Sequence, residues 1–338
     1  MPALSVILPC YNAAETLEEA LQSLAMQRFG DFEVLAVDDG SEDETGEILA
    51  RWAKRDARFR HLSQPHAGVI AASNAGMLAC RAPYIARMDA DDRALPARFA
   101  RQVAYLREHP QVAVVSSLVR AFPAEGTGKG FKIYIEWLNS LVSDAEIRRE
   151  IFVESPLPNP SVMFRRDWLL RMGGYQERGF PEDYDLYLRL YLAGARFAKI
   201  PEVLLEWREH PNRLTHTDSR YSLENFLRAK AYYLARGPLK GRDGVIIWGA
   251  GMMGRRLARQ LERQDVPVTA FADINEEKIG GVLRGKPIIA PDALHAWWGR
   301  YQAPALLAGV GSRAARRSIR QKLDEMGLVE EKDWWMAA

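Results

Sequence analysis

Short apolar runs alternate along the chain with longer segments in which apolar residues recur every three or four positions. The short runs predict buried strands, and the spaced apolar residues predict amphipathic helices. Because a polar turn separates a strand from the helix that follows it, the pattern predicts βαβ units and an α/β fold. The predicted strands before residue 236 lie at residues 4–9, 32–37, 59–64, 84–88, 111–119, 159–164 and 197–204.

The pattern is interrupted at residues 236–244, where Gly, Pro and charged residues stand without apolar periodicity. Such a composition is typical of a linker. A new series begins after it, with strands predicted at residues 245–248, 268–272 and 305–310. We therefore predict two domains, residues 1–236 and 245–338, joined by a linker at residues 237–244.

Composition narrows the class of protein. The 338 residues are enough for two domains with a core each, and the net charge of +2 argues against dependence on nucleic acid. Two cysteines form no disulfide framework, which favours a reducing compartment. We see no signal peptide and no apolar run near the roughly 20 residues of a membrane span. The expected location is cytoplasmic, and peripheral attachment to a membrane is compatible with it.

Three carboxylates follow the predicted strand at residues 84–88, namely Asp89, Asp91 and Asp92. Carboxylates this close repel one another, and a divalent cation with a preference for oxygen ligands, Mg2+ or Mn2+, would neutralise them. Strand ends in open α/β sheets are also where ligands bind. The alternative is a solvated acidic turn in which Asp92 caps a helix at residues 95–99.

Further acids open other helices. Asp38 and Asp39 end the strand at residues 32–37, where they either bind a ligand or cap the next helix. Glu182 and Asp183 stand in the first turn of a helix, whose dipole is expected to keep Asp183 ionised. His210 lies in a polar stretch rich in histidine, and it gains a functional role only if it faces the aspartates.

The second domain opens on a Gly-x-Gly-x-x-Gly motif, Gly249, Gly251 and Gly254, between a strand and a helix. With Asp273 about 20 residues further on, this motif fits a pyrophosphate at a helix N-terminus, although alone it is weak evidence for NAD. Three interpretations stay open: a nucleotide or nucleotide-sugar site, a docking or dimer surface, and a degenerate unit. The alternative function is a nucleotide-sugar or dinucleotide binding protein, or an oxidoreductase, that uses this motif. Residues 245–338 leave no room for a separate catalytic domain, which counts against the oxidoreductase.

Five motifs of the first domain occur in a characteristic order. They are Val6-Ile7-Leu8-Pro9-Cys10-Tyr11-Asn12, Val37-Asp38-Asp39-Gly40-Ser41, Gly68 with Asn74-Ala75-Gly76, Met88-Asp89-Ala90-Asp91-Asp92, and Pro181-Glu182-Asp183-Tyr184-Asp185. On these motifs, residues from about 4 to 217 resemble a family 2 glycosyltransferase of the GT-A fold. The resemblance implies a mixed, mainly parallel sheet with flanking helices. The second domain resembles the small Rossmann-like nucleotide-binding units appended to sugar-modifying enzymes.

The resemblance also implies roles for single residues. Asp91 would bind a Mg2+ or Mn2+ ion, with His210 as a further ligand, and Asp89 would contact the ion or the ribose. Asp183 would be the general base of an inverting displacement. The residues implied for the donor nucleotide-sugar are Pro9, Tyr11, Asn12, Asp38, Asp39, Asn74 and Asp89, and those for a nucleotide in the second domain are Gly249, Gly251, Gly254 and Asp273.

Some positions depart from the family pattern. Ser73 stands where Arg is frequent, and His66 stands where Asn is frequent. The Gln-x-x-Arg-Trp motif of processive members is missing from the late segment, which favours transfer of single sugars. The family resemblance also implies a saccharide or lipid-linked saccharide acceptor in the synthesis of cell-envelope or capsule polysaccharide. A homo-oligomer is compatible with this interpretation.

Overall fold

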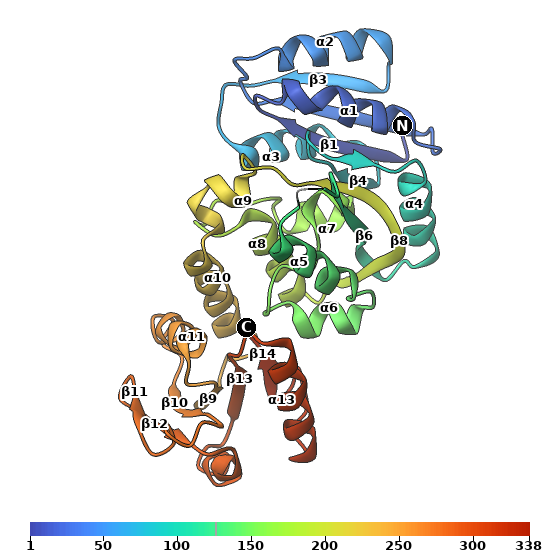
Figure 1. Ribbon diagram of the computed structural model, residues 1–338. Coiled ribbons are helices and arrows are strands. Elements are labelled where there is room, and N and C mark those ends of the chain that lie inside the picture. The colour runs from blue at the N-terminus through green and yellow to red at the C-terminus, as the bar shows by residue number, and fades with distance from the viewer. Residues whose placement is uncertain (126) are drawn as a thin grey trace. The chain divides into compact units, whose positions relative to one another are not determined.

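The computed structural model describes residues 1–125 and 127–338, and the chain divides into two compact units (Figure 1). The first unit comprises residues 1–147, 156–178 and 182–217, and the second comprises residues 148–155, 179–181 and 218–338. The second unit thus begins earlier than residue 245. The predicted boundaries at residues 236 and 245 concern independent folding, and they stay a prediction.

A mixed sheet of eight strands forms the first unit, in the order β3-β2-β1-β4-β7-β6-β8-β5 among the described residues. Strands β1 to β4 pair in parallel, β7 runs antiparallel to both β4 and β6, and β8 is parallel to β6. The predicted mixed sheet is confirmed. The strands are β1 Leu4–Cys10, β2 Phe32–Asp38, β3 Phe59–Ser63, β4 Tyr84–Arg87, β5 Arg93–Ala94, β6 Val112–Phe122, β7 Met163–Arg165 and β8 Arg196–Arg208.

Apolar spacing explains how the helices cover this sheet. Helix α1 buries Leu17, Leu21 and Leu24, which lie on one face at helical spacing. Helix α3 carries Gly76, where a Cβ atom would lie 2.8 Å from Ile7 Cγ2, so the small residue lets α3 approach β1 closely. The helices before residue 218 are α1 Ala14–Ala25, α2 Thr45–Arg55, α3 Val69–Ala79, α4 Arg98–Glu108, α5 Lys129–Asn139, α6 Asp144–Glu150, α7 Arg166–Arg171, α8 Glu182–Leu192 and α9 Leu214–Thr217.

The two capping alternatives and part of one predicted strand are wrong. Asp92 does not cap the following helix, because β5 intervenes and α4, whose N-cap is Ala97, begins only at Arg98. Likewise α2 has Glu44 as its N-cap, so neither Asp38 nor Asp39 caps it. Only the end of the strand predicted at residues 159–164 is extended, because Asn159–Ser161 forms a 3-10 turn. Asp92, Asp38 and Asp39 therefore do not cap the helices that follow them, and each is available for another role.

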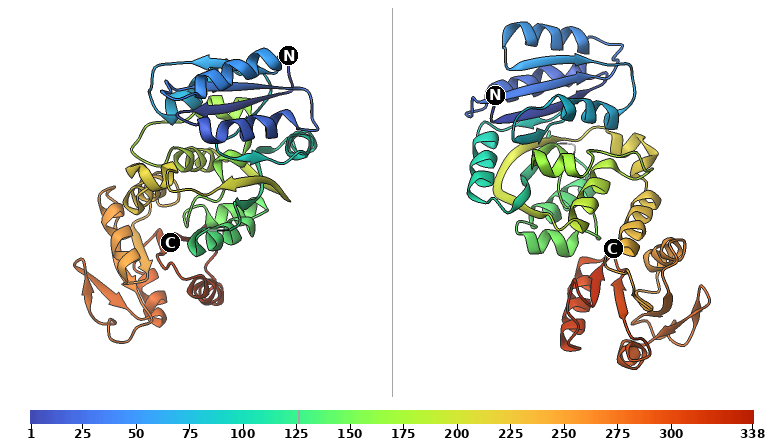
Figure 2. Two further views of the ribbon diagram at one scale, coloured as in Figure 1. Left: turned by 45° about the horizontal axis from the view of Figure 1, so that its top comes forward. Right: turned by 180° about the vertical axis from the view of Figure 1, so that it is seen from behind.

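The second unit contains a sheet of six strands among the described residues, in the order β11-β12-β10-β9-β13-β14. All neighbouring strands are parallel except β11 and β12. Helices α11 and α13 lie on opposite sides of this sheet, as the three views agree (Figures 1 and 2). The elements are α10 Leu223–Arg236, β9 Gly244–Trp248, α11 Met252–Glu262, β10 Val268–Ala272, β11 Val282–Leu283, β12 Lys286–Ile289, α12 Leu294–Trp298, β13 Pro304–Ala308, α13 Arg313–Glu325 and β14 Trp334–Met336, with 3-10 turns at Ser219–Tyr221 and Pro291–Ala293.

A buried network of ion pairs connects segments within the second unit. Glu150 receives Arg316 Nη1 at 3.2 Å and Arg320 Nη2 at 2.5 Å, and Arg320 also pairs with Glu330 at 3.1 Å. Glu150 and Arg316 are buried, so each charge depends on the other for compensation.

Within residues 1–125 and 127–338, no helix is long and apolar enough to cross a membrane. The predicted location and oligomeric state stay predictions.

Candidate active site

The acid loop, residues 89–92, follows β4 at the carboxyl end of the parallel strands. Its position is fixed by the ladder, because Met88 N–H donates to Ile7 O at 3.0 Å and Arg87 N–H donates to Val162 O at 3.0 Å. The loop gathers one ligand atom each of Asp89, Asp91 and Asp92 within 4.8 Å of one another. Three carboxylate oxygens in this space are a donor set that suits Mg2+ or Mn2+.

Asp92 is the most deeply buried of the three, with 1% of its surface exposed. Its Oδ1 accepts the N–H of Arg208 at 2.7 Å, whereas its buried Oδ2 has no hydrogen-bond partner in the part of the chain that the structure describes. Burial, together with the negative charges of Asp91 and Asp89, raises the pKa of Asp92 well above its usual range. A cation would offset both the burial and the repulsion.

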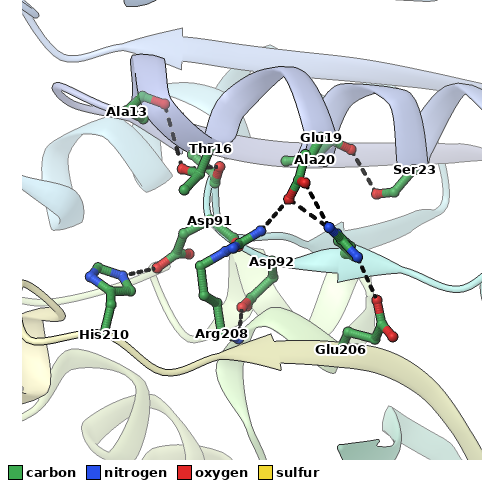
Figure 3. A network of polar contacts seen from close by, with 12 residues as sticks. Ala13, Thr16, Glu19, Ala20, Ser23, Asp91, Asp92, Glu206, Arg208 and His210 are labelled. Carbon is green, nitrogen blue, oxygen red and sulfur yellow. Dashed lines mark hydrogen bonds and ion pairs between the residues drawn. The ribbon is translucent and has the colours of Figure 1, made fainter. Parts of the chain in front are cut away.

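His210 meets the condition that the sequence analysis set for it. It follows β8, and its Nε2 atom lies 2.8 Å from Oδ2 of Asp91 (Figure 3). Imidazole nitrogen beside carboxylate oxygen is a ligand combination that Mn2+ accepts. The fold therefore brings together Asp91 and His210, which are 119 positions apart in the sequence.

Arg87 is a residue of this site that the sequence analysis missed. It is 2% exposed, and its Nη2 atom lies 2.7 Å from Oδ1 of Asp89. Burial raises the pKa of Asp89, while the charge of Arg87 opposes the shift. The available signal was an arginine inside the otherwise apolar run at residues 84–88, because a buried cation requires a nearby anion.

Asp183 lies in the first turn of α8, where its Oδ1 accepts the N–H of Tyr184 at 2.7 Å. Burial and the adjacent charge of Glu182 raise the pKa of Asp183 to about 8. The prediction that the helix dipole keeps it ionised is therefore wrong for the side chain as it stands, because burial and like charge outweigh the dipole. The charge of Asp89 also raises this pKa, so the two carboxylates act on each other.

Three of the residues predicted for the donor, Pro9, Tyr11 and Asn12, lie at the end of β1. Tyr11 is 46% exposed and stacks on His66, with ring centroids 4.0 Å apart and an interplanar angle of 26°. Asn12 bridges the two strand ends, since its N–H donates to Ser41 Oγ at 3.0 Å and its Oδ1 accepts the N–H of Glu42 at 2.9 Å. Pro9, partly buried, pairs with Val37 in the ladder.

The other predicted donor residues make internal contacts. Asp39 is 2% exposed, and its carboxylate accepts the N–H groups of Ala67 and Gly68 at 3.1 and 2.8 Å. Asp38 accepts the N–H of Ser41 at 3.0 Å. The amide of Asn74 is bonded to both main-chain groups of Tyr175, at 2.8 and 2.9 Å. In these contacts Asp38 and Asp39 fix the turns at Ser41 and Gly68, and Asn74 joins α3 to the segment at Tyr175.

The glycines of the second unit have distinct geometries. Gly249 has φ of +118°, and a Cβ atom on Gly254 would lie 1.8 Å from Gly249 O, so both positions require glycine. Gly251 has open space around its Cα. Asp273 accepts the N–H of Ala250 at 2.8 Å and that of Asn275 at 3.0 Å, and it pairs with Lys278 at 3.3 Å. Burial tends to raise the pKa of Asp273, but these donors outweigh it and lower that pKa.

Comparisons with known proteins match both parts of the chain. The family model described as glycosyl transferase family 2 matches residues 5–173, and the model described as C2185-like, N-terminal, matches residues 241–333. The amylovoran biosynthesis glycosyltransferase AmsE of Erwinia amylovora is 33% identical over 208 residues, which is 60% of this chain and 75% of AmsE. The match at residues 241–333 does not by itself test the predicted Rossmann-like unit.

Solved structures share the fold. Residues 1–349 of TarS from S. aureus, in complex with UDP-GlcNAc, align with a TM-score of 0.58 and 20% identity over 77% of this chain and 72% of that one. The mannosyltransferase PcManGT of Pyrobaculum calidifontis, in complex with GDP-Man and Mn2+, aligns with a TM-score of 0.52 and 20% identity over 70% of this chain and 64% of that one. These likenesses support the GT-A fold predicted for the first unit.

Proposed function

The chain belongs to glycosyl transferase family 2, and we propose that it transfers a single sugar from a nucleoside-diphosphate sugar to an acceptor hydroxyl with inversion. The observation that carries the proposal is the convergence of Asp89, Asp91, Asp92 and His210 at the end of β4. The proposed acceptor is a saccharide or lipid-linked saccharide in the synthesis of a cell-envelope or capsule polysaccharide. The relative named for amylovoran biosynthesis supports that setting.

Asp91 and His210 are the proposed ligands of a Mg2+ or Mn2+ ion, and Asp89 binds either the ion or the ribose. The ion supplies Lewis-acid stabilisation of the negative charge that grows on the leaving diphosphate. The buried, unpartnered oxygen of Asp92 supports a cation here, as does the Mn2+ in the PcManGT complex. Arg87 holds Asp89 in place through an ion pair of 2.7 Å.

Asp183 is the proposed general base. It takes the proton of the acceptor hydroxyl while that oxygen bonds to the anomeric carbon, and the bond from this carbon to the β-phosphate oxygen breaks. One displacement inverts the anomeric centre and releases the nucleoside diphosphate. Neutralising the charge of Asp89 would favour the carboxylate form of Asp183, because that charge contributes to its raised pKa.

The proposed donor site lies at the ends of β1 and β2. The exposed ring of Tyr11 offers a stacking surface for the base, and its stacking on His66 sets the orientation of the ring. Asp38 and Asp39 are proposed to read the base, and their contacts with the turns at Ser41 and Gly68 set the shape of that site. Pro9, Asn12 and Asn74 are proposed to form its walls.

A panel of UDP-, GDP- and dTDP-sugars, each with and without Mn2+, tests the proposal. The expected result is release of a nucleoside diphosphate from one donor class, with Mn2+ required and Asp183→Asn inactive. Arg120→Gln is the matched control, because Arg120 pairs with Glu206 on the surface. Donor turnover that persists in excess EDTA would overturn the metal dependence, and turnover of none of the donors would overturn the proposed activity.

We also propose that the second unit is a Rossmann-like domain that binds a nucleotide. The tight approach of Gly254 to Gly249 O and the parallel order of β10, β9 and β13 support this. Calorimetry with NAD should show binding that Gly251→Val removes, since Gly251 has open space where a side chain would block a phosphate. Equal affinities of wild type and Gly251→Val would place the ligand elsewhere.

A further inference from the structure

Arg208 joins the end of β8 to the acid loop at two points (Figure 3). Its main-chain N–H donates to Oδ1 of Asp92 at 2.7 Å, and its Nε–H donates to the main-chain oxygen of Asp91 at 2.5 Å. His210, which lies 2.8 Å from Asp91, follows two positions later on the same stretch of chain. Arg208 thus contacts two residues of the acid loop and lies two positions before His210.

The outer end of the Arg208 side chain is held by other elements. Its Nη2 atom pairs with the carboxylate of Glu19 on α1, and Glu19 also pairs with Arg93 at 2.6 Å. The guanidinium lies 4.5 Å from the ring centroid of Phe122 at the end of β6. The side chain of Arg208 is only 16% exposed, and these partners set its orientation.

The sheet fixes these two segments against each other only as far as the pair that comes just before Arg208. The ladder between β5 and β8 ends at the pair Arg93 and Glu206, and β4 is separated from β8 by β7 and β6. Beyond that ladder, Arg208 hydrogen-bonds the side chain of Asp92 and the main chain of Asp91, and it thereby connects the acid loop to the segment before His210.

We infer that Arg208 is a positioning residue that fixes His210 against Asp91, so that both ligands stand in place before a cation binds. The inference rests on the proposed metal-dependent function and deepens it. Groups that orient metal ligands typically change metal affinity by about 10- to 100-fold when removed. Glu19 supports the same arrangement from α1.

Positioning and simple charge predict opposite results. Arg208 is a cation beside three carboxylates, so its removal should tighten cation binding if only Coulomb repulsion mattered. If instead Arg208 orients His210, its removal should weaken cation binding. The sign of the change therefore separates the two explanations.

The test measures the dissociation constant of Mn2+ alone by electron paramagnetic resonance on the full chain. Arg208→Gln is expected to weaken binding by about 10- to 100-fold, with a smaller loss in Glu19→Gln. The control Arg120→Gln, which removes a guanidinium from the same surface network at Glu206, should bind Mn2+ like the wild type.

A second comparison shows the route of the effect. In a His210→Ala background, Arg208→Gln should weaken Mn2+ binding by less than about 2-fold, because residues that act through one another are not additive. An undiminished loss in that background, or binding that is unchanged or tighter in Arg208→Gln, would overturn the inference. If Arg208→Gln fails to fold, unchanged or tighter binding by Glu19→Gln overturns it.

Failure of the proposed function gives a different result. A wild type that binds no Mn2+, with Asp91→Ala indistinguishable from it, would overturn the metal dependence and this inference together. A wild type that binds Mn2+ through Asp91, but is insensitive to Arg208→Gln, would leave the function standing and overturn the inference alone.

Discussion

Replacing Asp183 by Asn should abolish turnover and at the same time stabilise the fold at neutral pH. Asn has the shape of Asp and can accept the N–H of Tyr184, a bond of 2.7 Å in the structure. Removing a positioned base typically lowers the rate by about 100- to 10,000-fold. If Asp183 only capped α8, the substitution would instead lower the stability of the protein by about 1 kcal/mol and change its activity little.

The pKa of Asp183, about 8, gives the sign of the stability effect. Because the folded state holds this proton more tightly than the unfolded state does, the contribution is favourable below about pH 4 and is lost as the pH rises through about 8. Relative to an ordinary value near 3.9, the raised pKa corresponds to a cost to folding of at most about 4 kcal/mol at pH 7. Asp183→Asn removes that cost.

The assay combines a pH profile with thermal melting. The kcat/KM of the wild type should rise with pH and level off at or below about pH 8, because the base must be ionised. A cation at Asp89 would lower the pKa of Asp183, because it would remove one of the charges that raise it. Glu182→Gln should shift the rise in kcat/KM to lower pH. The melting temperature of Asp183→Asn relative to the wild type should increase between pH 5 and pH 8.

Near wild-type turnover in Asp183→Asn, with donor and acceptor confirmed, would refute the assignment of the base. Glu182 or Asp185 would then be tested as the base. A pH profile that stays flat from pH 5 to pH 9 would refute the link between the raised pKa and catalysis.

Three further predictions concern the metal, the ion-pair network and the domains. Asp91→Ala should abolish Mn2+-dependent donor binding while the melting temperature stays unchanged, and calorimetry that finds wild-type donor affinity would contradict the metal role. Glu150→Ala should destabilise the second unit by about 3–5 kcal/mol in urea titrations, since it leaves Arg316 buried without its partner at 3.2 Å, and a loss below about 1 kcal/mol would show that water compensates. Residues 1–236 are predicted to fold alone, as judged by circular dichroism, whereas aggregation would place the boundary before α10, which packs within the second unit and buries Leu227.

Much of the first unit could be predicted from local pattern. The strands at residues 4–9 and 32–37 lie within one residue of β1 and β2, because a buried parallel strand needs a largely apolar run. The strand at residues 59–64 lies within one residue of β3, which is a more polar strand at the edge of the sheet. The strand predicted at residues 159–164 failed in its first half, since Pro160 has no N–H to donate to a ladder. Such failures are local and follow from single residues.

Some features of the candidate site follow from the sequence, and others arise only in the tertiary structure. Sequence alone determined that Asp89, Asp91 and Asp92 crowd at a strand end, because adjacency in the chain guarantees adjacency in space. Tertiary structure alone decided that His210 lies 2.8 Å from Asp91 and that Arg208 holds Asp92, across separations of 119 and 116 positions. It also decided the pKa of Asp183, because burial depends on every element packed around a side chain, whereas the dipole of its own helix can be read from a few neighbouring residues.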